Sequence, residues 1–124
     1  MNNENLLTEL ILKYAFKIHS ALGPGLLESS YKECLYYELN INGIYTEKEK
    51  AMPLYYEEIK MNVGYRADLV VEQKVIVEIK CCDSFNDVHV AQILTYLKLS
   101  KCRVGLLLNF KTASLRNGIK RYKI

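Results

Sequence analysis

Apolar residues recur every three or four positions along the first 22 residues of the chain, which is the spacing of one face of an α-helix. They are Leu7, Leu10, Ile11, Tyr14, Ala15, Ile18 and Leu22. The spacing predicts a helix over residues 6–22 that ends at Gly23-Pro24-Gly25, because proline biases the residue before it away from helical angles. A second helix is predicted over 27–40, with Tyr31, Leu35 and Leu39 on one face.

The middle of the chain changes to strand patterns. Alternating, β-branched or aromatic stretches predict strands over 44–49, 54–61, 65–71 and 75–80. Helical spacing returns over 87–100, and the continuous apolar run 104–110 is typical of a buried central strand. Residues 118–124 could add an edge strand. The predicted order is α-α-β-β-β-β-α-β, which indicates a mixed α/β fold.

Composition places the chain among ordinary globular proteins. It has 124 residues, of which 50% are hydrophobic and 25% are charged, so we expect one domain over residues 1–124. No run of 18 apolar residues is present and the N-terminus lacks the features of a secretion signal, so we expect no membrane span and a cytoplasmic location. The four cysteines form neither a CxxC pair nor a zinc-ligand spacing, which predicts free thiols.

Charge is distributed unevenly along the sequence. The last 37 residues carry eight basic and no acidic side chains, whereas the first 87 carry nine basic and all 14 acidic ones. Such an asymmetry is typical of a protein that turns one side toward a polyanion, and Lys120 and Arg121 are candidates to hold a phosphate backbone. A solvated surface explains the same counts equally well.

The chemistry is concentrated in the hairpin that spans residues 66–80. If its loop is the three residues 72–74, Asp68 lies opposite Glu78 and Arg66 lies opposite Lys80. Opposed side chains share a face and have Cβ atoms about 5 Å apart, so Asp68, Glu78 and Lys80 would form one group. Two adjacent carboxylates repel each other unless a divalent cation such as Mg²⁺ or Mn²⁺ lies between them. A surface hairpin with solvated charges is the alternative.

The residues around this hairpin resemble a known family. The segment Gly25-Leu26-Leu27-Glu28-Ser29-Ser30-Tyr31 is similar to the signature of the GxxExxY proteins, and the resemblance continues through RADLVVEQKVIVEIK to Gln92 and Tyr96. That family is assigned to the PD-(D/E)xK nuclease superfamily, so the resemblance implies a restriction-endonuclease-like fold with an α-β-β-β-α-β core. It also implies a metal-dependent activity on nucleic acid.

The resemblance assigns roles to particular residues. Asp68 matches the motif aspartate, and Glu78-Ile79-Lys80 matches the (D/E)xK element. The implied metal ligands are therefore Asp68, Glu78 and the carbonyl of Ile79, with Glu28 joining the metal shell directly or through water. Gln92 and Tyr96 resemble the QxxxY element of some members, and we expect them to reach DNA phosphates or the rim of the site. Ala67 stands where the proline of the superfamily name would be.

Several of these residues have a simpler explanation that the sequence leaves open. Glu28 falls in the first turn of a helix, where a carboxylate is favourable in any case. Tyr31 fits an apolar stripe in the core, and His89, which shares a helical face with Gln92, fits a partly buried histidine as well as a base or a phosphate ligand.

The leading hypothesis from the sequence is a nuclease that uses Mg²⁺ or Mn²⁺ to hydrolyse DNA phosphodiester bonds. Asp68, Glu78 and Glu28 would hold the metal and Lys80 would activate water. The alternative is a nucleic-acid-binding or protein-interaction module that keeps the fold without catalysis. The small size of the chain makes a homodimer or another protein partner a further expectation.

Overall fold

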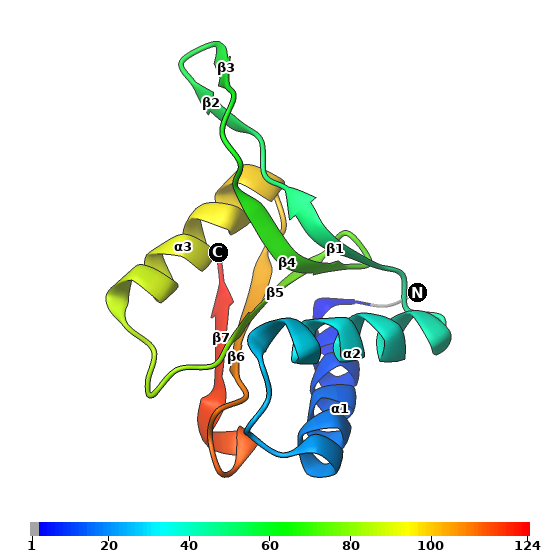
Figure 1. Cartoon of the computed structure of the whole chain (residues 1–124). Helices are drawn as coiled ribbons and strands as arrows, with labels where there is room; N and C mark the ends of the chain where they lie inside the picture. Colours follow the sequence, from blue (N-terminus) through cyan, green and yellow to red (C-terminus); the bar gives the residue numbers. More distant parts are fainter. Residues whose placement is uncertain (1–2) are drawn as a thin grey trace.

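A five-stranded mixed sheet covered by helices on both faces forms the centre of the computed structural model, which describes residues 3–124 (Figure 1). The helices are α1 (Glu4–Leu22), α2 (Glu28–Ile41) and α3 (Asp87–Ser100). The strands of this sheet are β1 (Thr46–Ala51), β4 (Arg66–Val71), β5 (Val75–Lys80), β6 (Val104–Asn109) and β7 (Ile119–Lys123). A short 3₁₀ turn over Leu115–Gly118 precedes β7.

The strands lie in the order β1-β4-β5-β6-β7. Neighbours are antiparallel except β5 and β6, which are parallel and joined through α3. A parallel connection needs such a crossover, and a crossover helix covers the sheet. Apart from one predicted strand, the elements and their order agree with the mixed α/β fold that the sequence pattern predicts and with the restriction-endonuclease-like fold that the resemblance implies.

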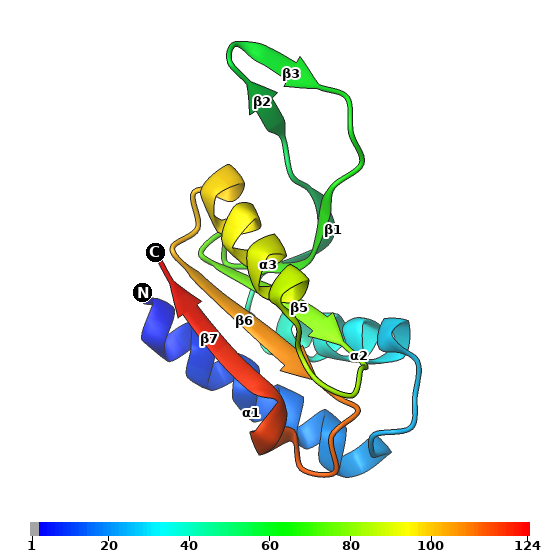
Figure 2. The same ribbon diagram turned by 90° about the vertical axis from the view of Figure 1, so that its left-hand side faces the viewer.

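Two hydrophobic cores lie on the two faces of the sheet. The core between the sheet and the helices α1 and α2 contains alternate strand residues such as Val75, Val77 and Ile79. The core under α3 contains Val70 and Ile76 from the opposite face of the same strands. The strand β6 is buried along its whole length, as the apolar run 104–110 predicts for a central strand. Together these cores fix α2 and α3 on opposite sides of β5 (Figure 2).

The predicted single strand over 54–61 is wrong. The structure has two short strands there, β2 (Leu54–Tyr56) and β3 (Ile59–Met61), which form a hairpin of their own. The turn between them contains Glu57 in the left-handed region at φ 58°. Glutamate rarely adopts that conformation, and the turn lacks the glycine or asparagine that usually marks it, so the sequence carries no signal for the break.

Smaller differences concern the ends of elements. Asn3 caps α1 through a side chain that accepts a hydrogen bond from the Leu6 N–H, so this helix begins at Glu4 rather than at residue 6. The strand β1 begins at Thr46 and continues to Ala51, two residues beyond its predicted end. The predicted edge strand over 118–124 is present as β7.

The four cysteines, Cys34, Cys81, Cys82 and Cys102, are free thiols, as predicted. Within residues 3–124, no helix combines the length and apolar character needed to cross a membrane.

Candidate metal and nucleic-acid site

The site begins where strands β4 and β5 separate. The three-residue loop 72–74 produces the predicted register, with Val71 paired to Val75 and Leu69 to Val77. The ladder ends at the Leu69–Val77 pair, although β4 continues beside β1 and β5 continues beside β6. The expected backbone pairings of Asp68 with Glu78 and of Arg66 with Lys80 therefore do not form. The Arg66 guanidinium instead donates to the carbonyl of Glu49 at 3.5 Å.

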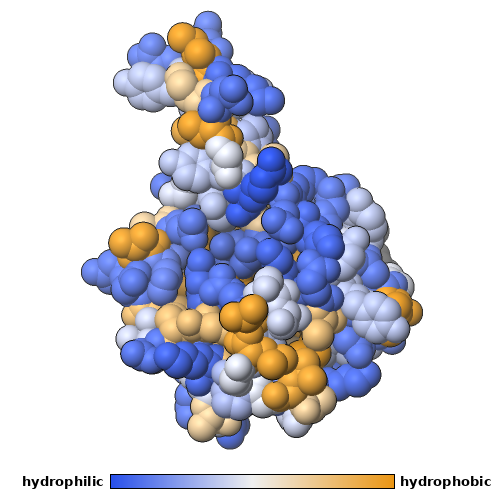
Figure 3. All heavy atoms as spheres, in the orientation of Figure 1, coloured by the Kyte–Doolittle hydropathy of each residue, from blue (hydrophilic) through white to orange (hydrophobic). Residues whose placement is uncertain are grey.

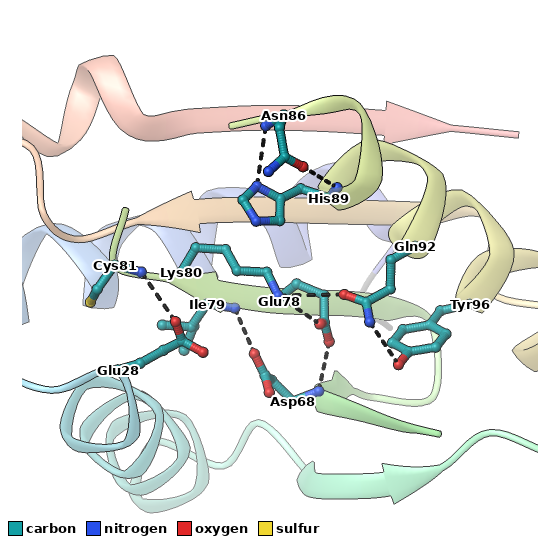
Figure 4. Close-up of polar contacts among 10 residues, drawn as sticks. All are labelled: Glu28, Asp68, Glu78, Ile79, Lys80, Cys81, Asn86, His89, Gln92 and Tyr96. Carbon is teal, nitrogen blue, oxygen red and sulfur yellow. Dashed lines mark hydrogen bonds and ion pairs between the residues drawn. The ribbon is translucent and has the colours of Figure 1, made fainter. Parts of the chain in front are cut away.

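Two carboxylates bridge this opening in place of backbone carbonyls. The N–H of Asp68 donates to Oε2 of Glu78 at 2.7 Å, and the N–H of Ile79 donates to Oδ2 of Asp68 at 2.8 Å (Figure 4). Each strand thus supplies a side-chain acceptor to the backbone of the other. The two carboxyl groups are held close together because the same opening must satisfy both N–H groups.

The electrostatics of this pair are unfavourable when no cation is present. Glu78 is only 3% exposed, and burial together with the nearby Asp68 charge raises the pKa of Glu78 to about 8. Burial also raises the pKa of Asp68, although its bond from the Ile79 N–H and the Lys32 and Lys80 charges oppose that shift. A buried carboxyl that holds its proton at neutral pH is a group that a divalent cation would convert to its charged form.

Lys80 lies beside the carboxylates on the face that α3 covers. Its Nζ is 3.9 Å from Oε1 of Glu78 and 3.4 Å from Oε1 of Gln92 on α3. Gln92 in turn donates to the hydroxyl of Tyr96 at 3.3 Å. Figure 4 shows this chain of side chains leading from the strand into the helix. Gln92 and Tyr96 therefore orient Lys80, and Tyr96, at 4% exposure, offers little surface for a ligand.

Glu28 reaches the site from the other side of the sheet. It is the first residue of α2, and its Oε2 accepts a hydrogen bond from the N–H of Cys81, just beyond β5, at 3.2 Å. A cleft of about 350 Å³ is lined by Glu28 and Asp68 together with Leu27, Ser29 and Lys32. Glu28 thus shares a cleft with one of the two bridging carboxylates.

Tyr31 explains how the Gly-Pro-Gly segment places Glu28. The Tyr31 ring is fully buried and stacks on Phe110 with ring centroids 4.4 Å apart. Its hydroxyl donates to the carbonyl of Gly23, which adopts φ 75°, and accepts from the N–H of Leu26 at 3.0 Å. Tyr31 therefore anchors the loop before α2. Glu28 lies in the same helical turn as Tyr31, so the anchored loop also positions Glu28 next to the sheet.

Lys32 is a candidate residue that sequence reasoning missed. It lies one helical turn after Glu28 and lines the same cleft as Asp68. Its Nζ is 3.7 Å from Oε2 of Glu49. Glu49 is unpaired in the β1–β4 ladder, at the position opposite Asp68, and adopts φ 50°. The Lys32 charge lowers the pKa of Asp68 more than the Lys80 charge does. Only the packing of α2 against β4 brings Lys32 there, so no sequence pattern marks it.

The two basic residues proposed for phosphate contact are separated by the sheet. Lys120 pairs with Leu107, which pairs with Glu78, so Lys120 lies in the same cross-strand row as Glu78, two strands away. Arg121 is the next residue along β7 and points to the opposite face, where its guanidinium donates to Asn5 of α1 at 2.8 Å. The basic C-terminal segment is thus divided between both faces of the sheet.

His89 has a structural role in this arrangement. Asn86 and His89 form a reciprocal cap at the start of α3, in which Asn86 accepts from the His89 N–H and the His89 ring accepts from the Asn86 N–H. The ring also contacts Phe85 edge-on. A partly buried histidine with a structural role, rather than a base or a phosphate ligand, accounts for all of these contacts.

The comparison with protein families agrees with this geometry. The family model of the PD-(D/E)XK nuclease superfamily matches residues 5–122. The chain belongs to this superfamily. No curated protein and no solved structure matched the chain in the corresponding comparisons. Membership in the PD-(D/E)XK superfamily confirms the predicted superfamily and fold, whereas the narrower resemblance to the GxxExxY proteins stays a prediction.

PD-(D/E)XK chemistry implies a divalent metal ion, and the carboxylates of the opening are the side chains that would hold it. Within residues 3–124, no three His, Cys, Asp or Glu side chains are arranged so that they could hold a metal ion by themselves. Two carboxylates are nevertheless a sufficient protein contribution for Mg²⁺, which commonly keeps several waters and uses one or two carboxylate ligands. The buried, proton-retaining Glu78 next to Asp68 fits an ion of this kind.

Proposed function

We propose that this chain is a metal-dependent nuclease that hydrolyses the phosphodiester bonds of DNA. The observation that carries the proposal is the carboxylate pair, Asp68 and Glu78, that bridges the opening between β4 and β5 beside the Lys80 ammonium. Membership in the PD-(D/E)XK nuclease superfamily supports nucleic acid as the class of substrate.

Asp68 and Glu78 would hold Mg²⁺ or Mn²⁺ together with the main-chain carbonyl of Ile79. The N–H and C=O of a strand residue point to the same side, and the Ile79 N–H points to Asp68, so its carbonyl is directed toward the same opening. Glu28 would complete the set directly or through water. When bound, the ion supplies Lewis-acid polarisation of a phosphate oxygen.

The remaining steps belong to side chains of the protein. The ammonium of Lys80, held by Gln92, would orient the attacking water and offset the negative charge that develops on the phosphate. Lys120, in the same cross-strand row as Glu78, would contact the DNA backbone and contribute a salt-dependent, sequence-independent part of the affinity.

A substrate panel tests the proposal. Purified protein is incubated with Mg²⁺ or Mn²⁺ and linear, circular, single-stranded or branched DNA, with Asp68→Asn as the inactive control. We expect cleavage of at least one substrate by the wild type and none by the variant. Retained DNA binding and metal binding without cleavage of any substrate would favour the non-catalytic binding module instead.

A further inference from the structure

The β2–β3 hairpin and its flanking residues, 52–65, form an arm that projects from the body of the molecule (Figures 1 and 2). Within residues 3–124, its two strands pair only with each other and belong to no larger sheet. A two-stranded hairpin is at best marginally stable in water without packing against something else. The arm therefore has the character of an element that lacks part of its packing.

One face of the β2–β3 hairpin consists of apolar and aromatic residues. Opposed residues share a face, and Leu54 is paired with Met61 while Tyr56 is paired with Ile59. Residues two apart on a strand also share a face, so these two pairs lie on the same side. The outer pair is open to solvent, with Tyr56 68% and Ile59 65% exposed. Figure 3 shows hydrophobic surface on the arm amid hydrophilic surroundings.

An apolar groove lies at the base of the arm. It has a volume of about 350 Å³ and runs between the arm and α3, where its lining includes Leu54, Val88, Ala91, Thr95 and Leu99. Val88, at the rim, is 73% exposed. Because Leu54 belongs both to the groove and to the apolar face of the arm, that face and the groove form one continuous surface.

The arm and the groove give the chain both a projection and a hollow. A two-fold interface uses the same patch on both subunits, so that patch must contain both a projection and a hollow that receives it. The outer pair Tyr56–Ile59 supplies the projection and the α3 groove supplies the hollow. We propose that the chain forms a two-fold symmetric dimer in which each arm packs its Tyr56–Ile59 pair into the α3 groove of the other copy.

Charge around the two parts is consistent with this pairing. The turn of the arm carries Glu57 and Glu58, directly beside the Tyr56–Ile59 pair. On α3, Lys98 precedes the groove residue Leu99, and Lys101 follows the end of the helix. Acidic side chains at the tip would be repelled by phosphates, which argues against nucleic acid as the occupant. They would be attracted by these two lysines of a second copy.

The dimer would border the candidate metal site. Gln92 and Tyr96 also line the α3 groove, and Gln92 accepts the hydrogen bond from Lys80. An arm seated in the groove would therefore cover the outer side of the residues that hold Lys80. The inference itself does not depend on nuclease activity, because the complementary surfaces contain none of the three residues Asp68, Glu78 and Lys80.

The oligomeric state across a concentration series tests the inference without metal or DNA. Light scattering after size exclusion should give twice the 14.4 kDa chain mass for the wild type. Tyr56→Ser with Ile59→Ser should raise the dissociation constant about thirty-fold or more, because anchor residues of this kind are typically worth at least 2 kcal/mol. Both side chains are exposed in the single chain, so the melting profile of the monomer should be preserved. A matched control, Tyr37→Ser with Ile41→Ser, removes two exposed apolar side chains of α2 and should leave the dimer intact.

Charge reversal distinguishes this interface from any other dimer. Glu57→Lys with Glu58→Lys, and separately Lys98→Glu with Lys101→Glu, should each weaken self-association. An equimolar mixture of the two reversed proteins should recover a heterodimer. The inference would be overturned by a wild type that stays monomeric at its highest soluble concentration. It would also be overturned by a dimer whose dissociation constant is unchanged by the substitutions in the arm. Loss of DNA affinity in the Tyr56/Ile59 variant of a monomeric protein would assign the arm to nucleic acid instead.

Discussion

The backbone N–H of Asp68 donates a 2.7 Å hydrogen bond to the carboxylate of Glu78, across the point where two strands stop pairing. Burial in this opening, and then the neighbouring Asp68 charge, raise the pKa of Glu78 to about 8, although the hydrogen bond from the Asp68 N–H opposes that shift. The Asp68 N–H needs a carboxyl oxygen of Glu78 as its acceptor, and a protonated Glu78 can supply that oxygen as well as a charged one. Proton binding, metal binding and stability are therefore linked at this pair.

The first prediction concerns stability as a function of pH. Between about pH 4.5 and 8 the unfolded chain has lost the Glu78 proton whereas the folded chain keeps it. The folded state then binds more protons, so the free energy of unfolding should decrease as the pH rises through this window, by on the order of a few kcal/mol. Glu78→Gln keeps an acceptor for the Asp68 N–H but cannot ionise, and it should flatten most of this slope. Urea denaturation of metal-free protein at several pH values measures both slopes. A wild type whose stability increases with pH across the window would contradict the assignment.

The second prediction concerns the metal. Binding to the folded state alone raises the melting temperature by mass action, so Mn²⁺ or Mg²⁺ should stabilise the wild type. Asp68→Asn retains an oxygen that can accept from the Ile79 N–H, so the fold should persist, but most of the metal-dependent rise should be lost. Thermal scans with and without Mn²⁺ measure the effect, and Asp83→Asn, a change to an exposed aspartate outside the opening, is the control. Equal stabilisation of wild type and Asp68→Asn would place any metal elsewhere.

The third prediction separates catalysis from metal binding. An ammonium cannot be a metal ligand, so Lys80→Ala should keep the thermal response to Mn²⁺ and most of the DNA affinity. Hydrolysis should fall on the order of a hundred- to a thousand-fold, because a group that offsets charge in the transition state is removed. Lys13→Ala on α1, an exposed lysine that lies over the Tyr14 ring, is the matched control. Single-turnover cleavage assays measure the rate. A Lys80→Ala protein that cleaves at the wild-type rate would remove this lysine from the mechanism.

The hairpin of the site was predictable from the sequence, whereas its geometry was not. The three residues 72–74 sit between two clear strand patterns, and this length alone set the register that brings Asp68 to Glu78. The separation of β4 from β5 has no such signal, because it depends on each strand keeping its other neighbour. Backbone groups in the opening then take side-chain partners instead.

The position of Glu28 and the existence of the arm could not be predicted from the sequence, for different reasons. The place of Glu28 depends on the Tyr31 hydroxyl, which holds the Gly23 carbonyl across the loop, and an aromatic on a core stripe gives no hint of that bond. The arm was missed because its turn contains Glu57 and Glu58 rather than a residue that favours positive φ. Local sequence signals predicted most of the elements, and long-range packing determined the rest.

The fourth prediction concerns Lys32, the second cation near the carboxylates. Lys32→Met removes a positive charge close to Asp68, so it should increase the affinity for Mn²⁺ by a few-fold and should decrease the affinity for DNA. A lysine with a purely structural role would not shift the two affinities in opposite directions. Lys48→Met is the control, since Lys48 also forms an ion pair on β1 but lies outside the cleft. Calorimetry with Mn²⁺ and fluorescence anisotropy with DNA and Ca²⁺ measure the two quantities, and a decrease in both would refute the role.

The last prediction uses neighbouring residues of β7 as a matched pair. Lys120 lies in the row that contains Leu107 and Glu78, about 10 Å from the Glu78 strand position at the usual strand spacing. Arg121 faces the other side of the sheet and contacts Asn5. If DNA lies across the face that carries Glu78 and Lys80, Lys120→Glu should weaken binding and reduce the slope of log affinity against log salt by about one unit. Arg121→Glu makes the same change of charge on the same strand and should have a much smaller effect. Anisotropy titrations at several salt concentrations measure both slopes. Equal losses in the two variants would indicate a general effect of net charge, and a larger loss for Arg121→Glu would move the DNA to the face covered by α1.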